Sequence, residues 1–227
     1  MRINAKSVPS GTVQHQVAAR LREALVQGRF LPGEALKIRD IAEAFGTSTQ
    51  PVRAAIKQLV AEQALEALPN RSARVSLLNN DKLEDLTRVR IAVEGLAVVL
   101  AIGHVVPKDI ARLKKLISLR PRDEAEHLAN HRDFHFTVYR LSGSTTLMPI
   151  IESLWLQLGP YLRRATHVVI GQNMEDQYHV ALIDALERRD ERAARKAVEM
   201  DIRGSVAYFS RRPAAEGSGR EWLRAAA

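Results

Sequence analysis

From about residue 81 to residue 210 the chain carries a succession of helix-length segments, and no stretch there alternates apolar and polar residues as a half-buried strand would. Prolines, glycines and short polar corners separate the segments. We predict six helices, near residues 81–103, 107–118, 123–142, 145–165, 173–187 and 190–210. Short connections favour antiparallel neighbours, so this part should form an all-α six-helix antiparallel bundle.

The first third of the chain has a different pattern. We predict three helices and a β-hairpin there, near residues 13–27, 38–45 and 48–64 for the helices and 65–68 and 73–77 for the strands. Gly46 breaks the chain before the third helix, which Ser48 or Thr49 should cap. The hairpin is the only sheet that we expect. Three short helices followed by a hairpin describe a winged helix-turn-helix.

The two patterns meet at Asn79-Asn80-Asp81, where Asp81 is expected to cap the next helix. We therefore predict a mainly α protein in three regions. These are a winged helix-turn-helix domain over residues 10–78, an all-helical domain over 79–212 and a flexible tail over 213–227.

Charge divides along the same line. The formal net charge is +8; residues 1–78 hold 11 Lys and Arg against 6 Asp and Glu, whereas residues 79–210 hold 19 against 18. A basic excess favours a polyanionic partner, although many basic proteins bind none. The first domain is therefore the candidate for binding double-stranded DNA, and the nearly neutral second domain needs another explanation.

Several absences narrow the function classes. The chain has no Cys, which excludes a disulfide scaffold, a Cys-type zinc finger, an iron–sulfur cluster and a thiol nucleophile. No apolar run approaches the roughly 18 residues of a membrane span, and there is no glycine-rich phosphate loop. We expect a cytoplasmic protein that is not bound to a membrane.

Polar and basic residues gather where a winged helix-turn-helix meets DNA. The third predicted helix begins with short polar groups that suit bases and phosphates, and cations stand beside them and at the hairpin tip. The candidate DNA-binding residues are Arg39, Ser48, Thr49, Gln50, Arg53, Lys57, Asn70 and Arg71. The alternative for each Arg taken singly is a solvated surface charge.

These segments closely resemble the GntR family of bacterial transcription regulators. The resemblance spans about residues 13–77 and is carried by Leu21-Arg-Glu-Ala-Leu25, Gly28-Arg-Phe-Leu-Pro-Gly33, Leu36-Lys-Ile-Arg-Asp-Ile-Ala42 and Gly46-Thr-Ser-Thr-Gln-Pro-Val-Arg-Ala-Ala-Ile56. It implies that Arg39, Ser48, Thr49 and Arg53 contact operator DNA and that the wing tip enters the minor groove. The family usually has Arg at position 49 and Gly at position 72, where this chain has Thr and Ser.

In the helical region, three histidines and one aspartate fall on apolar helix faces. His131 and His135 are four residues apart on one face, and His179 shares a face with apolar residues. Asp201 lies in the buried stripe of the last helix, where a carboxylate is costly unless it is paired or bound to a cation. His179 and Asp201 are also about equally far from the corner between the last two helices. The set suits a divalent ion such as zinc, nickel or manganese.

This region resembles the FCD effector domain of FadR-like GntR regulators, in their shorter, VanR-like branch. The resemblance covers about residues 81–210, through Val89-Arg-Ile-Ala-Val-Glu-Gly-Leu-Ala97, Phe134-His-Phe-Thr-Val-Tyr-Arg-Leu-Ser-Gly143 and Tyr178-His-Val-Ala-Leu-Ile-Asp-Ala-Leu186. It implies metal ligands at positions 131, 135, 179 and 201. This chain has His where the family has Asp at 131, and Asp where it has the final His at 201. The exchange preserves three His and one Asp; a metal-free polar pocket is the competing interpretation.

Arg90 and Tyr139 are the candidate effector-binding residues. Arg90 lies on or beside the inward face of its helix, where it could meet the carboxylate of an organic acid. The alternative is a structural ion pair with Glu94, four residues later. For Tyr139 the alternative is packing in the core.

The leading hypothesis is a ligand-responsive transcription regulator, a repressor if it follows the commoner family behaviour, and not an enzyme. A homodimer on a palindromic operator is expected, because two heads double the contacts. An all-helical metal hydrolase is the second hypothesis, although no spare general base stands beside the proposed ligands. The third, a sequence-indifferent DNA-packaging protein, fits poorly with a neutral, pocket-bearing second domain.

Overall fold

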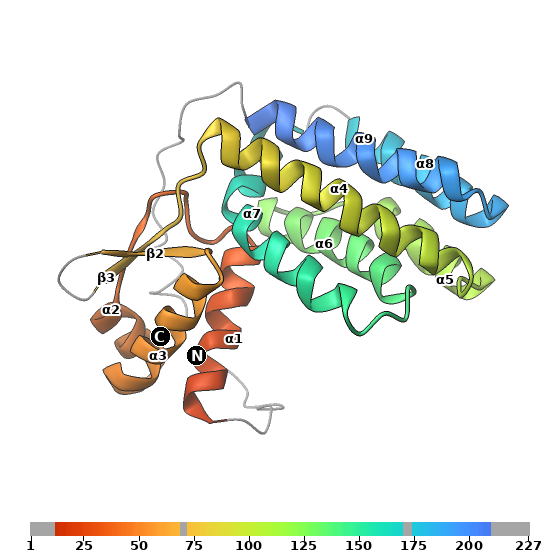
Figure 1. Ribbon diagram of the computed structural model, residues 1–227. Helices are drawn as coiled ribbons and strands as arrows, with labels where there is room; N and C mark the ends of the chain where they lie inside the picture. Colours follow the sequence, from red (N-terminus) through yellow and green to blue (C-terminus); the bar gives the residue numbers. More distant parts are fainter. Residues whose placement is uncertain (1–11, 69–71, 170–173, 210–227) are drawn as a thin grey trace.

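The computed structural model describes residues 12–68, 72–169 and 174–209. They form a mainly α fold in two parts, three helices with a small sheet and a bundle of six further helices (Figure 1). This is the fold class that the sequence predicts. None of the helices in these ranges has the length and the apolar composition that a membrane span requires. The hairpin tip with Asn70 and Arg71, and the predicted tail over 213–227, lie outside the described residues.

The first part contains a three-stranded antiparallel sheet in the order β1-β3-β2. Its elements are α1 Val13–Val26, β1 Ala35–Lys37, α2 Ile38–Ala44, α3 Thr49–Ala61, β2 Leu65–Leu68 and β3 Ser72–Val75. Strand β1 corrects the expectation that the hairpin is the only sheet. It has three residues with one buried side chain, Leu36, which stands opposite Ala73. So short a strand gives no recognisable alternation, and its pairing with β3 depends on the tertiary fold.

The turn between α2 and α3 requires a glycine. Gly46 has φ +61°, a left-handed conformation that side chains disfavour, and the Thr47 N–H donates to the carbonyl of Ala42. Ser48 occupies the N-cap position, as predicted, but its side chain makes no capping hydrogen bond. The apolar face of α3 packs into a core with α1 through Val52, Ile56 and Leu59. Its opposite face is left outside this core.

The second part consists of α4 Asn80–Ile102, α5 Pro107–Ser118, α6 Glu124–Arg140, α7 Leu147–Val169, α8 Met174–Arg188 and α9 Glu191–Phe209. Asn79, and not Asp81, caps α4, because its side chain accepts a hydrogen bond of 2.8 Å from the Lys82 N–H. Asp81 instead stands in the first turn, where a carboxylate still favours the helix dipole.

Helix α4 runs along the bundle beside α9, and it also packs on α6 and α7 (Figure 1). Helices α8 and α9 form an antiparallel pair around a tight corner at Arg189, which has φ +54°. The corner closes with a hydrogen bond of 2.9 Å from the Asp190 N–H to the carbonyl of Ala185. This pairing sets the level at which α8 and α9 side chains meet.

Helix α7 belongs to both parts of the molecule. Leu156 lies in the apolar core of the first part, whereas Trp155 and Leu158 lie in the bundle core. Gly159 lies directly against α1: a Cβ added there would overlap the carbonyl oxygen of Leu25. The same Cβ would stand 2.6 Å from the Cα of Val26. The two main chains can approach this closely only because residue 159 has no side chain.

The hydroxyl of Tyr161 adds a second link between α7 and the first part. It accepts a hydrogen bond of 2.6 Å from the Leu78 N–H and donates one of 3.2 Å to the carbonyl of Ser76. Both partners belong to the segment that leaves the sheet and leads into α4. One helix therefore fixes the bundle to α1 and to the connection that follows β3.

Candidate metal centre and nucleic-acid interface

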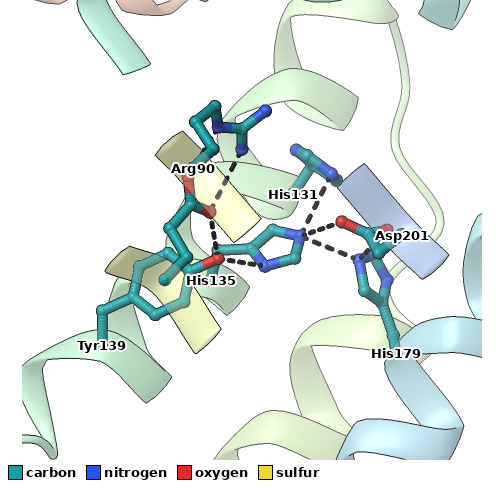
Figure 2. A network of polar contacts seen from close by, with 7 residues as sticks. Arg90, His131, His135, Tyr139, His179 and Asp201 are labelled. Atoms are coloured by element: carbon teal, nitrogen blue, oxygen red, sulfur yellow. Dashed lines mark hydrogen bonds and ion pairs between the residues drawn. The ribbon is translucent and has the colours of Figure 1, made fainter. Parts of the chain in front are cut away.

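Four polar side chains converge inside the bundle, His131 and His135 from α6, His179 from α8 and Asp201 from α9 (Figure 2). One possible ligand atom from each lies within 4.8 Å of all the others. His135 Nε2 is 3.2 Å from the Nε2 atoms of both His131 and His179, and 3.3 Å from Asp201 Oδ2. The structure thus brings together all four residues that the sequence singled out.

Local structure explains this convergence. His131 and His135 are one turn apart on α6, so their rings project from the same face. The α8–α9 corner places the other two at one level, with 3.7 Å between His179 Nε2 and Asp201 Oδ1. All four side chains are buried; His131, the most exposed, retains 9% of its surface.

Three imidazoles at this distance cannot all carry a proton. Burial holds the pKa of His135 well below its usual value, and the positive potential of His131, His179 and Arg90 lowers it further. A neutral imidazole keeps a lone pair on one ring nitrogen, which is the form that binds metal ions. The cluster therefore combines His135, as a neutral nitrogen donor, with two further imidazoles and one carboxylate.

Buried polar contacts hold the Nδ1 side of the His135 ring, which faces away from the cluster. The Tyr139 hydroxyl donates a hydrogen bond of 2.5 Å to Glu94 Oε2, and its oxygen lies 3.3 Å from His135 Nδ1 (Figure 2). Burial and Glu94 hold the pKa of Tyr139 well above its usual range, so the hydroxyl keeps its proton. Its oxygen can then accept a hydrogen bond from the Nδ1–H of His135, which leaves the lone pair on Nε2, facing the cluster.

Arg90 is held by the same glutamate. Its Nε lies 2.5 Å from Glu94 Oε1 and its terminal nitrogen 3.1 Å from Oε2. Burial alone would lower the pKa of Arg90, but the attraction of Glu94 outweighs burial and raises it. The structure contains the Arg90–Glu94 pair that the sequence left as an alternative. Roles for Arg90 and Tyr139 in effector binding remain predictions.

Trp155 forms one wall of the centre. Its ring centroid is 5.7 Å from that of His131 and 5.5 Å from that of His135, and the Arg90 guanidinium lies 5.2 Å from it. The indole Nε1 is buried, and no described residue accepts its hydrogen bond. A buried donor without an acceptor is uncommon and is often explained by a bound molecule.

A small cavity lies against the cluster, between α5, the α5–α6 connection, α6 and α8. His131 and His179 form part of its wall, and His127 and Asn130 of α6 supply further polar groups. Neither His127 nor Asn130 was predicted from the sequence as a site residue. The signal was present, because His127 precedes His131 by four residues, the same spacing that separates His131 from His135.

The predicted DNA-binding residues of the described chain lie around the start of α3. Arg39, Ser48, Gln50 and Lys57 are exposed, and Thr49 and Arg53 are half-buried. In the part of the chain that the structure describes, no ion pair occupies Arg39, Arg53 or Lys57. Arg74 in the wing is different, because it pairs with Glu66 at 2.7 Å. Uncompensated cations beside a helix N-terminus suit a phosphate backbone.

A winged helix-turn-helix joined to a helical bundle with a buried polar centre is the architecture of a ligand-responsive transcription regulator. Residues 13–75 match the gntR family of bacterial regulatory proteins, and residues 85–204 match the FCD domain. The chain belongs to the GntR family and carries an FCD domain, as the resemblance implied.

The chain is similar to named transcription regulators over most of their length. The chain is 30% identical over 202 residues to the HTH-type transcriptional regulator McbR of Escherichia coli, covering 86% of this chain and 91% of that protein. It is 28% identical to the HTH-type transcriptional repressor GlaR of the same organism, covering 75% and 83%. The structure of E. coli McbR/YncC superposes with a TM-score of 0.80 at 26% identity, covering 88% and 98%.

The protein is a DNA-binding transcription regulator with an effector-binding C-terminal domain. The fold alone would not separate this function from catalysis, but the relatives are named as transcription regulators. The alternative of a metal-dependent hydrolase finds no support among them.

Proposed function

We propose that this regulator represses transcription as a homodimer on a palindromic operator and that a metal ion in the bundle forms part of its effector site. The observation that carries the proposal is the convergence of three histidines and one aspartate in a buried centre. The proposed ligands are His131, His135, His179 and Asp201. A regulator of bacterial genes works on DNA in the cytoplasm, which is the location that we propose.

The donor set supports a first-row divalent ion, with zinc, nickel and manganese as candidates. Neutral imidazole nitrogens bind such ions well, and the carboxylate offsets part of their charge. Compared with the family pattern, His and Asp have exchanged places at 131 and 201. Because both positions face the same centre, the exchange keeps the donor types and the net charge of the set.

The chemistry of the centre supports a small organic acid as effector. Three neutral imidazoles and one carboxylate leave a divalent ion with uncompensated positive charge, which favours an anion. An acceptor oxygen of the effector would also give Trp155 Nε1 the hydrogen bond that it lacks among the described residues. Arg90 and Tyr139, held together by Glu94, are proposed to respond to this ligand.

The outer face of α4 supports a dimer. Val89, Leu96 and Leu100 are 39%, 42% and 41% exposed, and Ala92 is exposed between them. Their spacing forms an apolar stripe along the side of α4 that the bundle does not cover. A helix that is apolar on both sides is normally covered on both. We propose that a second copy of the chain packs on this stripe in an isologous interface.

For DNA, we propose that the N-terminus of α3 enters the major groove, with Ser48, Thr49, Gln50 and Arg53 at base edges or phosphates. Arg39 and Lys57 would contact the backbone, and Asn70 and Arg71 the minor groove. Arg39 and Lys57 are exposed and form no ion pair with any described residue, which supports the roles proposed for these two. Helix α7 would carry an effector-induced shift from Trp155 to α1.

Metal analysis of protein purified without chelator or His-tag tests the proposal. We expect about one ion per chain, and its loss in His135→Ala. The same variant should bind effector more weakly, measured by calorimetry with an organic acid found to release operator DNA. Metal-free protein, combined with unchanged effector affinity in His135→Ala, would favour the metal-free pocket. The matched control is His104→Ala, which removes an exposed histidine at the end of α4.

A further inference from the structure

The proposed metal centre is enclosed, so an ion must pass between helices to reach it. His135, at the middle of the cluster, is 1% exposed, and His179 and Asp201 are each 6% exposed. The small cavity described above touches two of the four residues, His131 and His179. The same cavity is lined by Leu119, which is 40% exposed, so it extends from the cluster toward the protein surface at the α5–α6 connection.

The polar groups of this cavity follow the axis of α6. His127 is half-buried and stands one turn before His131, which stands one turn before His135. Residues four apart on a helix share a face, so the three imidazoles form a row from the cavity to the middle of the cluster. Asn130 adds an amide to the same wall. The remaining lining, including Leu116 and Ile117, is mostly apolar.

The size of the cavity decides how an ion could use it. Its volume is about 50 Å³. At roughly 10–15 Å³ for each water molecule, it holds about four waters. A hydrated first-row ion usually carries more, so it must lose part of its water shell on the way in. Protein donors have to replace the lost waters, and imidazole is a preferred donor for these ions.

We propose that this cavity is the access route for the divalent ion and that His127 is its outer ligand. His127 would bind the partly hydrated ion and pass it to His131 and His179. The inference rests on the metal-binding function proposed above, but it concerns the rate of binding and not the final ligand set. A residue that binds the ion only in passage changes association and dissociation equally and leaves the dissociation constant unchanged.

Stopped-flow fluorescence with Ni²⁺ tests this inference. Trp155 packs on His131 and His135, so its emission should be quenched when Ni²⁺ reaches the cluster; the Trp222→Phe background removes the other tryptophan. We expect His127→Ala to slow association and dissociation by about tenfold each, as loss of one contact at the barrier would. The equilibrium dissociation constant should stay within about twofold of the parent value, a change of under 0.5 kcal/mol.

Two further variants distinguish the loss of a metal-binding atom from a change in the shape of the cavity. His127→Asp keeps a metal-binding atom and should restore much of the association rate, whereas His104→Ala, at an exposed histidine away from the cavity, should leave it unchanged. Melting followed by circular dichroism checks that each variant is folded. If His127→Ala fails to fold, Leu119→Phe tests the route instead, because a larger side chain at the mouth should slow both rates and adds no second tryptophan.

The possible outcomes are distinct. An unchanged association rate in folded His127→Ala, or in Leu119→Phe where that variant is used, would overturn the access route. A weaker dissociation constant with an unchanged association rate would overturn it too, because His127 would then stabilise the bound ion. A parent protein that binds no Ni²⁺, Zn²⁺ or Mn²⁺ at equilibrium would overturn the metal function, and the access route with it.

Discussion

The winged helix-turn-helix and the helical bundle place their polar groups differently. Of the described residues up to 78, Ser76 is the one polar side chain that is buried, and it lies at the connection to the bundle. Among its described residues the bundle buries nine, Thr87, Arg90, Glu94, His131, His135, Thr137, Ser142, His179 and Asp201. Burying charged and polar groups costs free energy that apolar packing would not.

This difference indicates where each part meets its partner. The first part keeps an apolar interior and presents its cations outside, as binding to a long polyanion requires. The bundle accepts costly polar groups inside, as enclosure of a small ligand or ion requires. Surface substitutions in the first part should therefore change DNA affinity with little effect on stability. Substitutions of buried polar groups in the bundle should change ligand affinity and stability together.

The largest expected effect comes from the contact between the two parts, where α7 of the bundle lies against α1. Gly159→Ala inserts a methyl group into the main-chain contact with Leu25 and Val26, and the backbone must move. We expect a loss of about 3 kcal/mol in the free energy of unfolding, at the upper end of overpacking costs, together with weaker operator binding. Denaturant titration and a DNA-binding assay measure the two effects.

The control for this variant is Gly103→Ala. A Cβ at Gly103 would lie 3.7 Å from the nearest atom, the carbonyl oxygen of Leu100, at ordinary contact distance. Its stability should stay close to that of the parent protein. Equal stabilities for the two variants would mean that α1 and α7 are not packed as described.

Removal of one hydroxyl tests how His135 is oriented inside the bundle. Tyr139→Phe takes away the oxygen that stands between His135 Nδ1 and Glu94, so the imidazole loses the group that orients it. We expect metal affinity to fall by about 10-fold to 100-fold, as for other partners behind a metal ligand. Competition with a chromophoric chelator measures it. Tyr178→Phe on α8 is the control, and equal affinities would leave Tyr139 with a packing role only.

A surface substitution tests the first part. Arg53→Ala should weaken operator binding by about 1–2 kcal/mol, with little change in the free energy of unfolding. If Arg53 contacts phosphate, the salt dependence of binding should also become shallower; if it reads a base, specificity should relax at one position. Arg192→Ala, an exposed arginine on α9, removes the same charge elsewhere and should have no effect.

The smallest effect concerns pH and metal-free protein. Because the pKa of His135 is depressed in the folded state, the unfolded chain binds more protons below about pH 6.5. The contribution of His135 to the free energy of unfolding is therefore complete above that pH. It falls as the pH decreases toward the pKa of His135 in the folded state. The slope should approach, at most, about 1.4 kcal/mol per pH unit for this group. Unfolding at several pH values should show a shallower slope in His135→Gln.

Much of this arrangement was predictable, because it depends on spacing along single helices or about one corner. The helix period places His131 and His135 on one face, and equal distances from the α8–α9 corner place His179 level with Asp201. Strand β1 was missed because three residues carry no period of their own. Gly159 was missed because a close approach of α7 to α1 depends on the path of both helices. The domain division after residue 78 stays a prediction.

The contact at Gly159 also has a mechanical consequence. Most helix pairs touch through side chains, whose torsions can rotate and absorb a small displacement. Here the main chain of α7 lies on the main chain of α1, and no rotatable bond stands between them. A shift of α7 by a fraction of an ångström cannot be absorbed by repacking a rotamer at this point. It must move α1 as a rigid rod, so the crossing acts as a stiff mechanical linkage between the two halves.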